Sequence, residues 1–191
     1  MVTKLHPQIS GNGISYDSDP SQLVVDRFEE IYQQQIKGTP IENPALSVEA
    51  VGFQLWNNQW VGILITPWFL NLMIMSAEKT GWSKISADAQ QQWQFPCGPI
   101  SMLKNADDTL GLYYCCSLAS PMSAFDSHES TRQTALEIMQ MLFVAGNETN
   151  DVTQDQKQAS LGKLNVDAER KKVAVSRRSF LRGVLGSGDK P

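Results

Sequence analysis

The side chains that most often carry catalysis or bind metals are scarce in this chain. It holds three cysteines, Cys97, Cys115 and Cys116, and two histidines, His6 and His128, both expected to be solvated. No C-x-x-C or H-x-x-x-H spacing occurs, so the sequence does not support a structural zinc site. Serine-hydrolase, phosphate-loop and dinucleotide-binding motifs are also missing. We therefore expect a protein that is not an enzyme and that has no cofactor and no metal.

The three cysteines leave one alternative open, a thiol-based redox carrier or enzyme that uses Cys97, Cys115 or Cys116. Their odd number and irregular spacing do not form a disulfide framework, and adjacent Cys115 and Cys116 would face opposite sides of a strand. A nucleophilic cysteine needs a neighbouring base or a positive environment to become a thiolate. The neighbours Tyr114 and Ser117 offer neither, so packing in the core is the favoured interpretation.

The segment 176–183 reads S-R-R-S-F-L-R-G, which matches the consensus of twin-arginine export signals. Such a signal needs a long apolar region after the arginines, and the eight residues that follow the motif, 184–191, do not supply one, so export by this motif is not expected. One interpretation is a solvated basic tail. The other is mimicry, in which Arg177 and Arg178 supply paired hydrogen bonds and Phe180 with Leu181 an apolar anchor. The motif would then occupy a signal-reading surface, on a partner or on this chain's own acidic body.

Charge is distributed unevenly along the 191 residues. Residues 1–144 carry a net charge of −7 and residues 145–191 a net charge of +3. An acidic body argues against a nucleic-acid surface, because phosphates are bound by a basic patch. The sequence starts without the apolar segment of a signal peptide, and no apolar run reaches the roughly 18 residues of a spanning helix. We therefore expect a cytoplasmic protein without a stable membrane anchor.

Two helices are predicted, one near each end of the acidic body. Asp19-Pro20-Ser21-Gln22 is typical of a helix start, and apolar residues follow at helical spacing until Gly38-Thr39-Pro40 ends the pattern. The second helix is predicted to begin with Asp126 as its N-cap and Glu129 in the capping-box position. Its buried stripe is expected to comprise four apolar residues: Ala135, Ile138, Met139 and Leu142.

Strand patterns fill most of the region between these helices. Five strands are predicted, at 48–55, 60–66, 69–75, 100–104 and 110–118. A slip in the alternation at Ala50–Val51, just before Gly52, predicts a bulge, and Asn57-Asn58 predicts a hairpin turn. A short helix is predicted around 86–93.

This order of elements predicts an α+β fold, an antiparallel sheet with two main helices packed on one of its faces. We divide the chain into a flexible arm at 1–18, the α+β domain at 19–144 and a disordered basic tail at 145–191. The tail prediction depends on the loss of hydrophobic periodicity after Val144 and on a composition rich in polar residues.

The most informative aromatic residues are Trp68 and Phe69, which directly follow Pro67. Pro67 cannot donate to a strand ladder, so the chain must bend or lie at an edge there. Large aromatic side chains at such a bend, close to Met73 and Met75, suit a surface that grips and releases a partner. The alternative is that Trp68 caps the core.

Three motifs carry a resemblance to a known family. They read A-L-S-V-E-A-V-G-F at 45–53, W-x3-W-x-G-x-L-I-T-P-W-F-x-N-L-M at 56–73 and C-S-L-A-S-P-M-S at 116–123. In these motifs the chain resembles the HybE/HupJ family of nickel–iron hydrogenase assembly chaperones, over roughly residues 20–144. The resemblance implies a non-enzymatic cytoplasmic protein that binds hydrogenase large-subunit or small-subunit precursors, or both, during maturation before export.

The resemblance also marks residues and further partners. Six residues match the best-marked stretches of the family: Pro67, Trp68, Phe69, Ser120, Pro121 and Ser123. They either contact a client or hold the fold, and the resemblance leaves both roles open. Other maturation chaperones are additional candidate partners. Some relatives carry a C-terminal rubredoxin module, but this chain has no paired C-x-x-C, so we expect no iron-carrying role.

Overall fold

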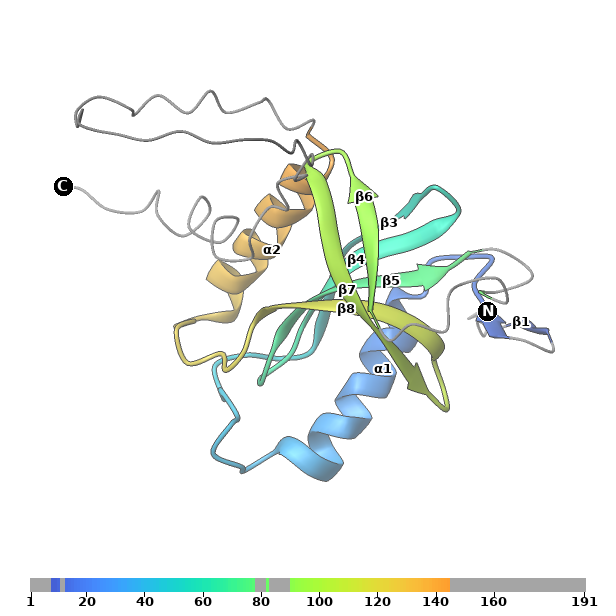
Figure 1. Cartoon of the computed structure of the whole chain (residues 1–191). Helices are drawn as coiled ribbons and strands as arrows, with labels where there is room; N and C mark the ends of the chain where they lie inside the picture. The colour runs from blue at the N-terminus through green and yellow to red at the C-terminus, as the bar shows by residue number, and fades with distance from the viewer. Residues whose placement is uncertain (1–7, 11–12, 78–81, 83–89, 145–191) are drawn as a thin grey trace, which may run out of the picture.

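The computed structural model describes residues 8–10, 13–77, 82 and 90–144 (Figure 1). A small sheet of two strands precedes a sheet of six antiparallel strands in the order β3-β4-β5-β8-β7-β6. The elements are β1 (Gln8–Ser10), β2 (Gly13–Ser15), α1 (Ser21–Ile31), the π-helical turn η1 (Tyr32–Ile36), β3 (Glu49–Trp56), β4 (Gln59–Ile65), β5 (Leu70–Ser76), β6 (Gln90–Phe95), β7 (Gly98–Asp107), β8 (Gly111–Ala119) and α2 (His128–Leu142). The predicted α+β fold with two main helices is confirmed.

The two helices lie on opposite faces of the six-stranded sheet, so the prediction that both pack on one face is wrong. α2 packs its predicted stripe against Val61 and Ile63 of β4 in one core cluster. α1 packs Val24 and Phe28 against Leu64 of β4 in the other. Alternate residues of a strand face opposite sides, so the unbroken apolar sequences of β4 and β5 need cover on both faces. Figure 1 shows α1 in blue and α2 in orange, with central strands between them.

Local turn signals account for the first hairpin of the large sheet. Asn57 and Asn58 have φ values of 47° and 58°, as a two-residue hairpin turn requires, so this prediction is confirmed. The predicted bulge is also present, with the register of β3 against β4 shifting between Val51 and Gln54. Gly52, at the shift, has a φ of 65°, a conformation that side chains with a Cβ rarely adopt.

Two predicted element boundaries are wrong. The first concerns the helix expected at 86–93. Residues 90–95 form strand β6 instead, which pairs with β7, and residues 86–89 lie outside the described part. Exposure alternates along this strand and ends at buried Phe95, so its packing overrides the helix propensity of glutamine. Helix α2 is capped by Ser127, not by Asp126, because the Ser127 Oγ accepts the Ser130 N–H at 3.2 Å.

The end of the expected N-terminal arm is part of the folded domain. Tyr16 is buried, its N–H donates to the Ser76 carbonyl and its hydroxyl donates to the Leu110 carbonyl at 2.9 Å. The Trp60 indole N–H donates in turn to the Tyr16 carbonyl. Residues 1–7, 11–12 and 145–191 lie outside the described part, so the division of the chain into arm, domain and tail stays a prediction. Neither of the described α-helices is long and apolar enough to cross a membrane.

Candidate functional site

Three connecting loops meet at one end of the domain, and Asn43 links them. Its loop, 37–48, runs from η1 to β3, and its backbone N–H donates to the Pro67 carbonyl at 2.8 Å. Its side-chain Nδ2 donates to the carbonyls of Met122 and Phe125 at 3.0 and 2.8 Å. The 66–69 connection between β4 and β5 and the 120–127 connection between β8 and α2 are thereby held against the first loop. We call this end of the domain the three-loop surface.

Sequence reasoning missed Asn43, although a local signal was present. Asn43-Pro44 is a dipeptide typical of turns, and the Asn43 Oδ1 accepts the Ala45 N–H at 3.0 Å, the side-chain turn that asparagine favours. The signal predicts that the chain turns there. It does not predict which carbonyls, about 80 positions away, complete the hydrogen bonds of the amide.

A groove of about 450 Å³ lies on the three-loop surface. Its walls are proline-rich and partly apolar, and it is lined by Pro40, Ile41, Glu42, Asn43, Pro44, Ala45, Pro121, Ser123, Phe125 and Asp126. Ile41 is 51% exposed. The titratable side chains among these lining residues are two carboxylates, Glu42 and Asp126.

Trp68 does not line the groove, but its carbonyl accepts the hydroxyl of Ser120, the neighbour of the lining residue Pro121. Trp68 is half-buried, which is intermediate between the exposed and the core positions that the sequence leaves open. Its ring stacks on Tyr32 with centroids 6.3 Å apart and meets Phe69 edge to face at 5.1 Å. Phe69 in turn meets Phe28 of α1 edge to face, and Pro67 is buried. The aromatic group thus ties the β4–β5 connection to α1 and η1.

The aromatic group is connected to the groove through a tyrosine. The Tyr32 hydroxyl donates to a Glu42 carboxylate oxygen, and the Gly38 N–H donates to the other oxygen. These two hydrogen bonds, that of Tyr32 first, lower the pKa of Glu42, because they stabilise the charged form of the carboxylate. Glu42 is therefore ionised at neutral pH.

The two sequence stretches marked by the resemblance lie next to each other in the structure. The Ser120 hydroxyl donates to the Trp68 carbonyl at 3.3 Å, and Pro121 and Ser123 line the groove. The other predicted partner-binding residues, Arg177, Arg178, Phe180 and Leu181, lie outside the described part of the chain.

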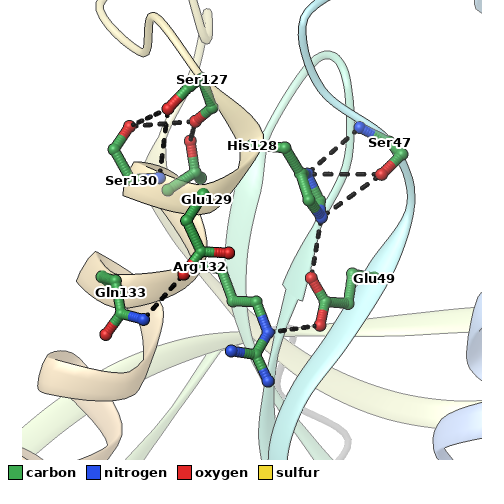
Figure 2. Close-up of polar contacts among 9 residues, drawn as sticks. Ser47, Glu49, Ser127, His128, Glu129, Ser130, Arg132 and Gln133 are labelled. Atoms are coloured by element: carbon green, nitrogen blue, oxygen red, sulfur yellow. Dashed lines mark hydrogen bonds and ion pairs between the residues drawn. The ribbon is translucent and has the colours of Figure 1, made fainter.

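A hydrogen-bonded cluster next to the groove joins the start of α2 to the start of β3 (Figure 2). The His128 Nε2 lies 2.8 Å from one Glu49 oxygen, and the Arg132 Nε donates to the other at 2.9 Å. The Ser47 backbone and hydroxyl also face the His128 ring. His128 therefore has defined partners, and the expectation that it is merely solvated is wrong.

The cysteines occupy three different environments. Cys115 and Cys116 face opposite sides of β8, as predicted, and Cys116 is buried in the core cluster under α2. Cys97 lies at the turn between β6 and β7, where burial raises the pKa of its thiol and so opposes thiolate formation. Among the described residues, no group of three or more His, Cys, Asp and Glu is placed to hold a metal ion.

Comparison with known proteins identifies the family. The family model described as NiFe-hydrogenase assembly, chaperone, HybE matches residues 19–183. The probable rubredoxin HupJ of Rhodobacter capsulatus is 34% identical over 131 residues, 69% of this chain and 47% of that protein, so the chain spans about half the length of this relative. The hydrogenase expression/formation protein HupJ of Bradyrhizobium diazoefficiens is 29% identical over 180 residues, 93% of this chain and 97% of that protein.

A solved structure has the same fold. The solution structure of HybE from Escherichia coli superposes with a TM-score of 0.58 at 24% identity, over 83% of this chain and 98% of that one. At this identity the likeness concerns the fold alone, and the family model carries the assignment. The chain belongs to the HybE family of nickel–iron hydrogenase assembly chaperones.

Proposed function

We propose that this protein holds precursors of nickel–iron hydrogenase subunits in the cytoplasm during maturation before export, and that it grips them with the three-loop surface. Family membership supports the class of client. The observation that carries the choice of surface is the meeting of the 66–69 and 120–126 segments, far apart in the sequence, beside one groove.

The groove has the properties of a preformed binding surface. Asn43 holds its walls together through three hydrogen bonds to other loops, so little conformational freedom is lost on binding. Ile41 exposes an apolar side chain within it, and half-buried Trp68 is linked to it by the hydrogen bond from Ser120, which precedes the lining residue Pro121. A central aromatic residue next to an apolar wall is typical of the residues that dominate interface affinity.

The chemistry of the groove supports binding rather than catalysis. Its lining residues offer two carboxylates, of which Glu42 already accepts two hydrogen bonds. They include no cysteine, histidine or lysine that would act as a nucleophile or a base. A non-enzymatic holding function is therefore the proposal, with the large subunit, the small subunit or both as clients and other maturation chaperones as further partners.

A matched pair of substitutions tests the choice of surface. Ile41 and Leu55 are both large, exposed apolar residues, at 51% and 58%, and Leu55 lies near the far end of β3. Ile41→Ser is expected to weaken binding of a purified subunit precursor about tenfold, which corresponds to about 1.4 kcal/mol. Leu55→Ser is expected to leave binding unchanged. Thermal melting of both variants checks that the fold is intact.

Trp68→Ala extends this test to the aromatic group. We expect client affinity to fall by about 2 kcal/mol, as for a central interface aromatic, and folding stability to fall by less, because the ring is only half-buried. Affinity and melting midpoint are measured on one sample. Equal losses for Ile41→Ser and Leu55→Ser, or a Trp68→Ala variant that loses stability but binds normally once folded, would place the client elsewhere.

A further inference from the structure

The titratable side chains that line the groove of the three-loop surface are both carboxylates, Glu42 and Asp126. Arg132 pairs with the Glu49 carboxylate, whereas the Lys37 ammonium donates to the neutral Gln33 side chain and its charge contributes to the lowered pKa of Glu42. Within the described part of the chain, exposed Asp126 has no hydrogen-bond or ion-pair partner. Among the described residues that line the groove, Asp126 therefore offers a carboxylate without a partner, in addition to the ionised Glu42.

Apolar surface accompanies this charge. Ile41 and Phe125 line the groove together with Pro40, Pro44 and Pro121. A peptide that fits must supply both cations and apolar side chains a few residues apart. An arginine suits the free carboxylate, because its planar guanidinium donates two parallel hydrogen bonds.

We propose that the occupant of this groove in the free protein is the chain's own segment 176–183, S-R-R-S-F-L-R-G. Arg177 or Arg178 pairs with Asp126, and Phe180 with Leu181 packs on Ile41 and Phe125. The charge is complementary at larger scale as well, since residues 145–191 carry +3 and residues 1–144 carry −7.

The length of chain before the motif permits this contact. The described part ends next to the C-terminal end of α2, and the groove lies at its N-terminal end. The 15 residues of α2 place these ends about 22 Å apart at roughly 1.5 Å per residue. Even at the short rise of a helix, the 31 residues from 145 to 175 would span about 46 Å, so the linker is long enough for the motif to reach the groove.

Tethering makes such a contact effective even when its intrinsic affinity is weak. A segment joined to its site has an effective concentration in the millimolar range for linkers of suitable length. The motif would then cover the apolar wall until a client displaces it. This consequence rests on the proposed function, whereas the contact itself does not need a client.

Photo-crosslinking in the full-length chain tests the contact without any client. A benzophenone amino acid replaces Phe180, and mass spectrometry maps the crosslinked peptide. We expect intrachain crosslinks to residues 40–45 or 121–126, with a yield that falls several-fold as salt rises, because exposed charges are screened.

Two variants and one control decide the result. Asp126→Asn, and separately the double change Arg177→Lys with Arg178→Lys, are each expected to lower the crosslink yield at least threefold. Asp108→Asn removes a similarly exposed carboxylate from the turn before β8, at the other end of the sheet, and is expected to have no effect. Melting midpoints confirm that the variants are folded.

Four outcomes would overturn the proposal: no intrachain crosslink, crosslinks only between chains, crosslinks to another face of the domain, or a yield that neither variant changes. Each leaves the client-binding proposal intact, since that depends on Ile41→Ser and Trp68→Ala. Conversely, if neither Ile41→Ser nor Trp68→Ala weakened client binding, the proposed tail contact would be unaffected.

Discussion

At the scale of single residues, Asn43 decides how the three-loop surface is assembled. Its amide and its backbone N–H join three segments through hydrogen bonds. An asparagine has the right groups for this because one side chain carries both a donor and an acceptor. The site therefore depends on a residue that both lines the groove and holds its walls together.

Replacement of Asn43 by Ala is expected to lower folding stability by about 2 kcal/mol, since three side-chain hydrogen bonds are lost, and two carbonyls and the Ala45 N–H lose a partner. Client affinity should fall as well, because the groove walls are no longer held together. Asn105→Ala is the matched control, since the Asn105 amide donates only within its own hairpin. Denaturant unfolding and client binding measure both effects. A similar loss of client affinity in the two variants would contradict the role of Asn43.

Replacement of all three cysteines by Ala or Ser is expected to leave hydrogenase maturation largely intact. Cys116 is buried, so the variant should lose about 1 kcal/mol of stability, and Cys97 has a thiol pKa raised by burial. Maturation is scored by hydrogenase activity in cells that produce the variant at wild-type level. Loss of maturation with unchanged folding would revive the thiol alternative, and native-state thiol titration would then identify the reactive residue.

At the scale of elements, β3 and β4 fit together through a close approach at Gly62. A Cβ built on Gly62 would lie 2.1 Å from the Phe53 ring, so the ring must move when any side chain is added. Gly62→Ala is expected to cost about 2–3 kcal/mol from overpacking. Gly38→Ala is the comparison, because Gly38 has a φ of 77° and open space around it, so its cost of about 1 kcal/mol is conformational alone. Chemical denaturation compares them, and equal costs would contradict the steric explanation.

Helix α1 is fixed to the turn between β7 and β8 by a carboxylate. Burial of Asp107 raises its pKa, but the N–H groups of Leu110 and Thr109 and the Arg27 guanidinium outweigh this, so the pKa is lowered overall. A carboxyl group with a lowered pKa in the folded state stabilises the fold above its unfolded pKa of about 3.9. That stabilisation is lost as the pH falls from there through the folded-state value.

Asp107→Asn is therefore expected to lower the melting midpoint at neutral pH and to flatten its decline below about pH 4. The adjacent exposed Asp108 provides the control, and Asp108→Asn should retain the wild-type decline. Melting curves between pH 7 and the acid range measure both. An identical acid profile for wild type and Asp107→Asn would mean that other carboxylates govern the acid response.

At the scale of the whole molecule, we expect trypsin to separate a resistant domain from an accessible tail. Lys157, Lys163 and the basic cluster at 170–178 should be cut well before Arg27 and Arg132. Arg27 pairs with Asp107 and Glu30, and Arg132 pairs with Glu49, so both lie in packed structure. A time course read by mass spectrometry orders the cuts. Equal protection of the tail sites would contradict the division near residue 144.

Structural features that depend only on residues close together in the sequence were determined by the sequence itself. The Asn57–Asn58 turn, the bulge at Gly52 and the buried stripe of α2 follow from local backbone preferences and hydrophobic spacing, and all three are present. The motifs of the resemblance likewise led to the family that the family model assigns. The helix expected at 86–93 is the counterexample, because packing of β6 against β7 outweighs local propensity.

Only the tertiary structure decided which face each helix covers and which loops meet. A continuous apolar strand predicts burial on both faces, but not which helix lies on which side. The contacts that build the groove join residues 79 to 82 positions apart, such as Asn43 with Met122 and Phe125. The residues next to Asn43 are the same whichever distant carbonyl it meets, and the register of the sheet, not the local sequence, decides which carbonyls lie within reach.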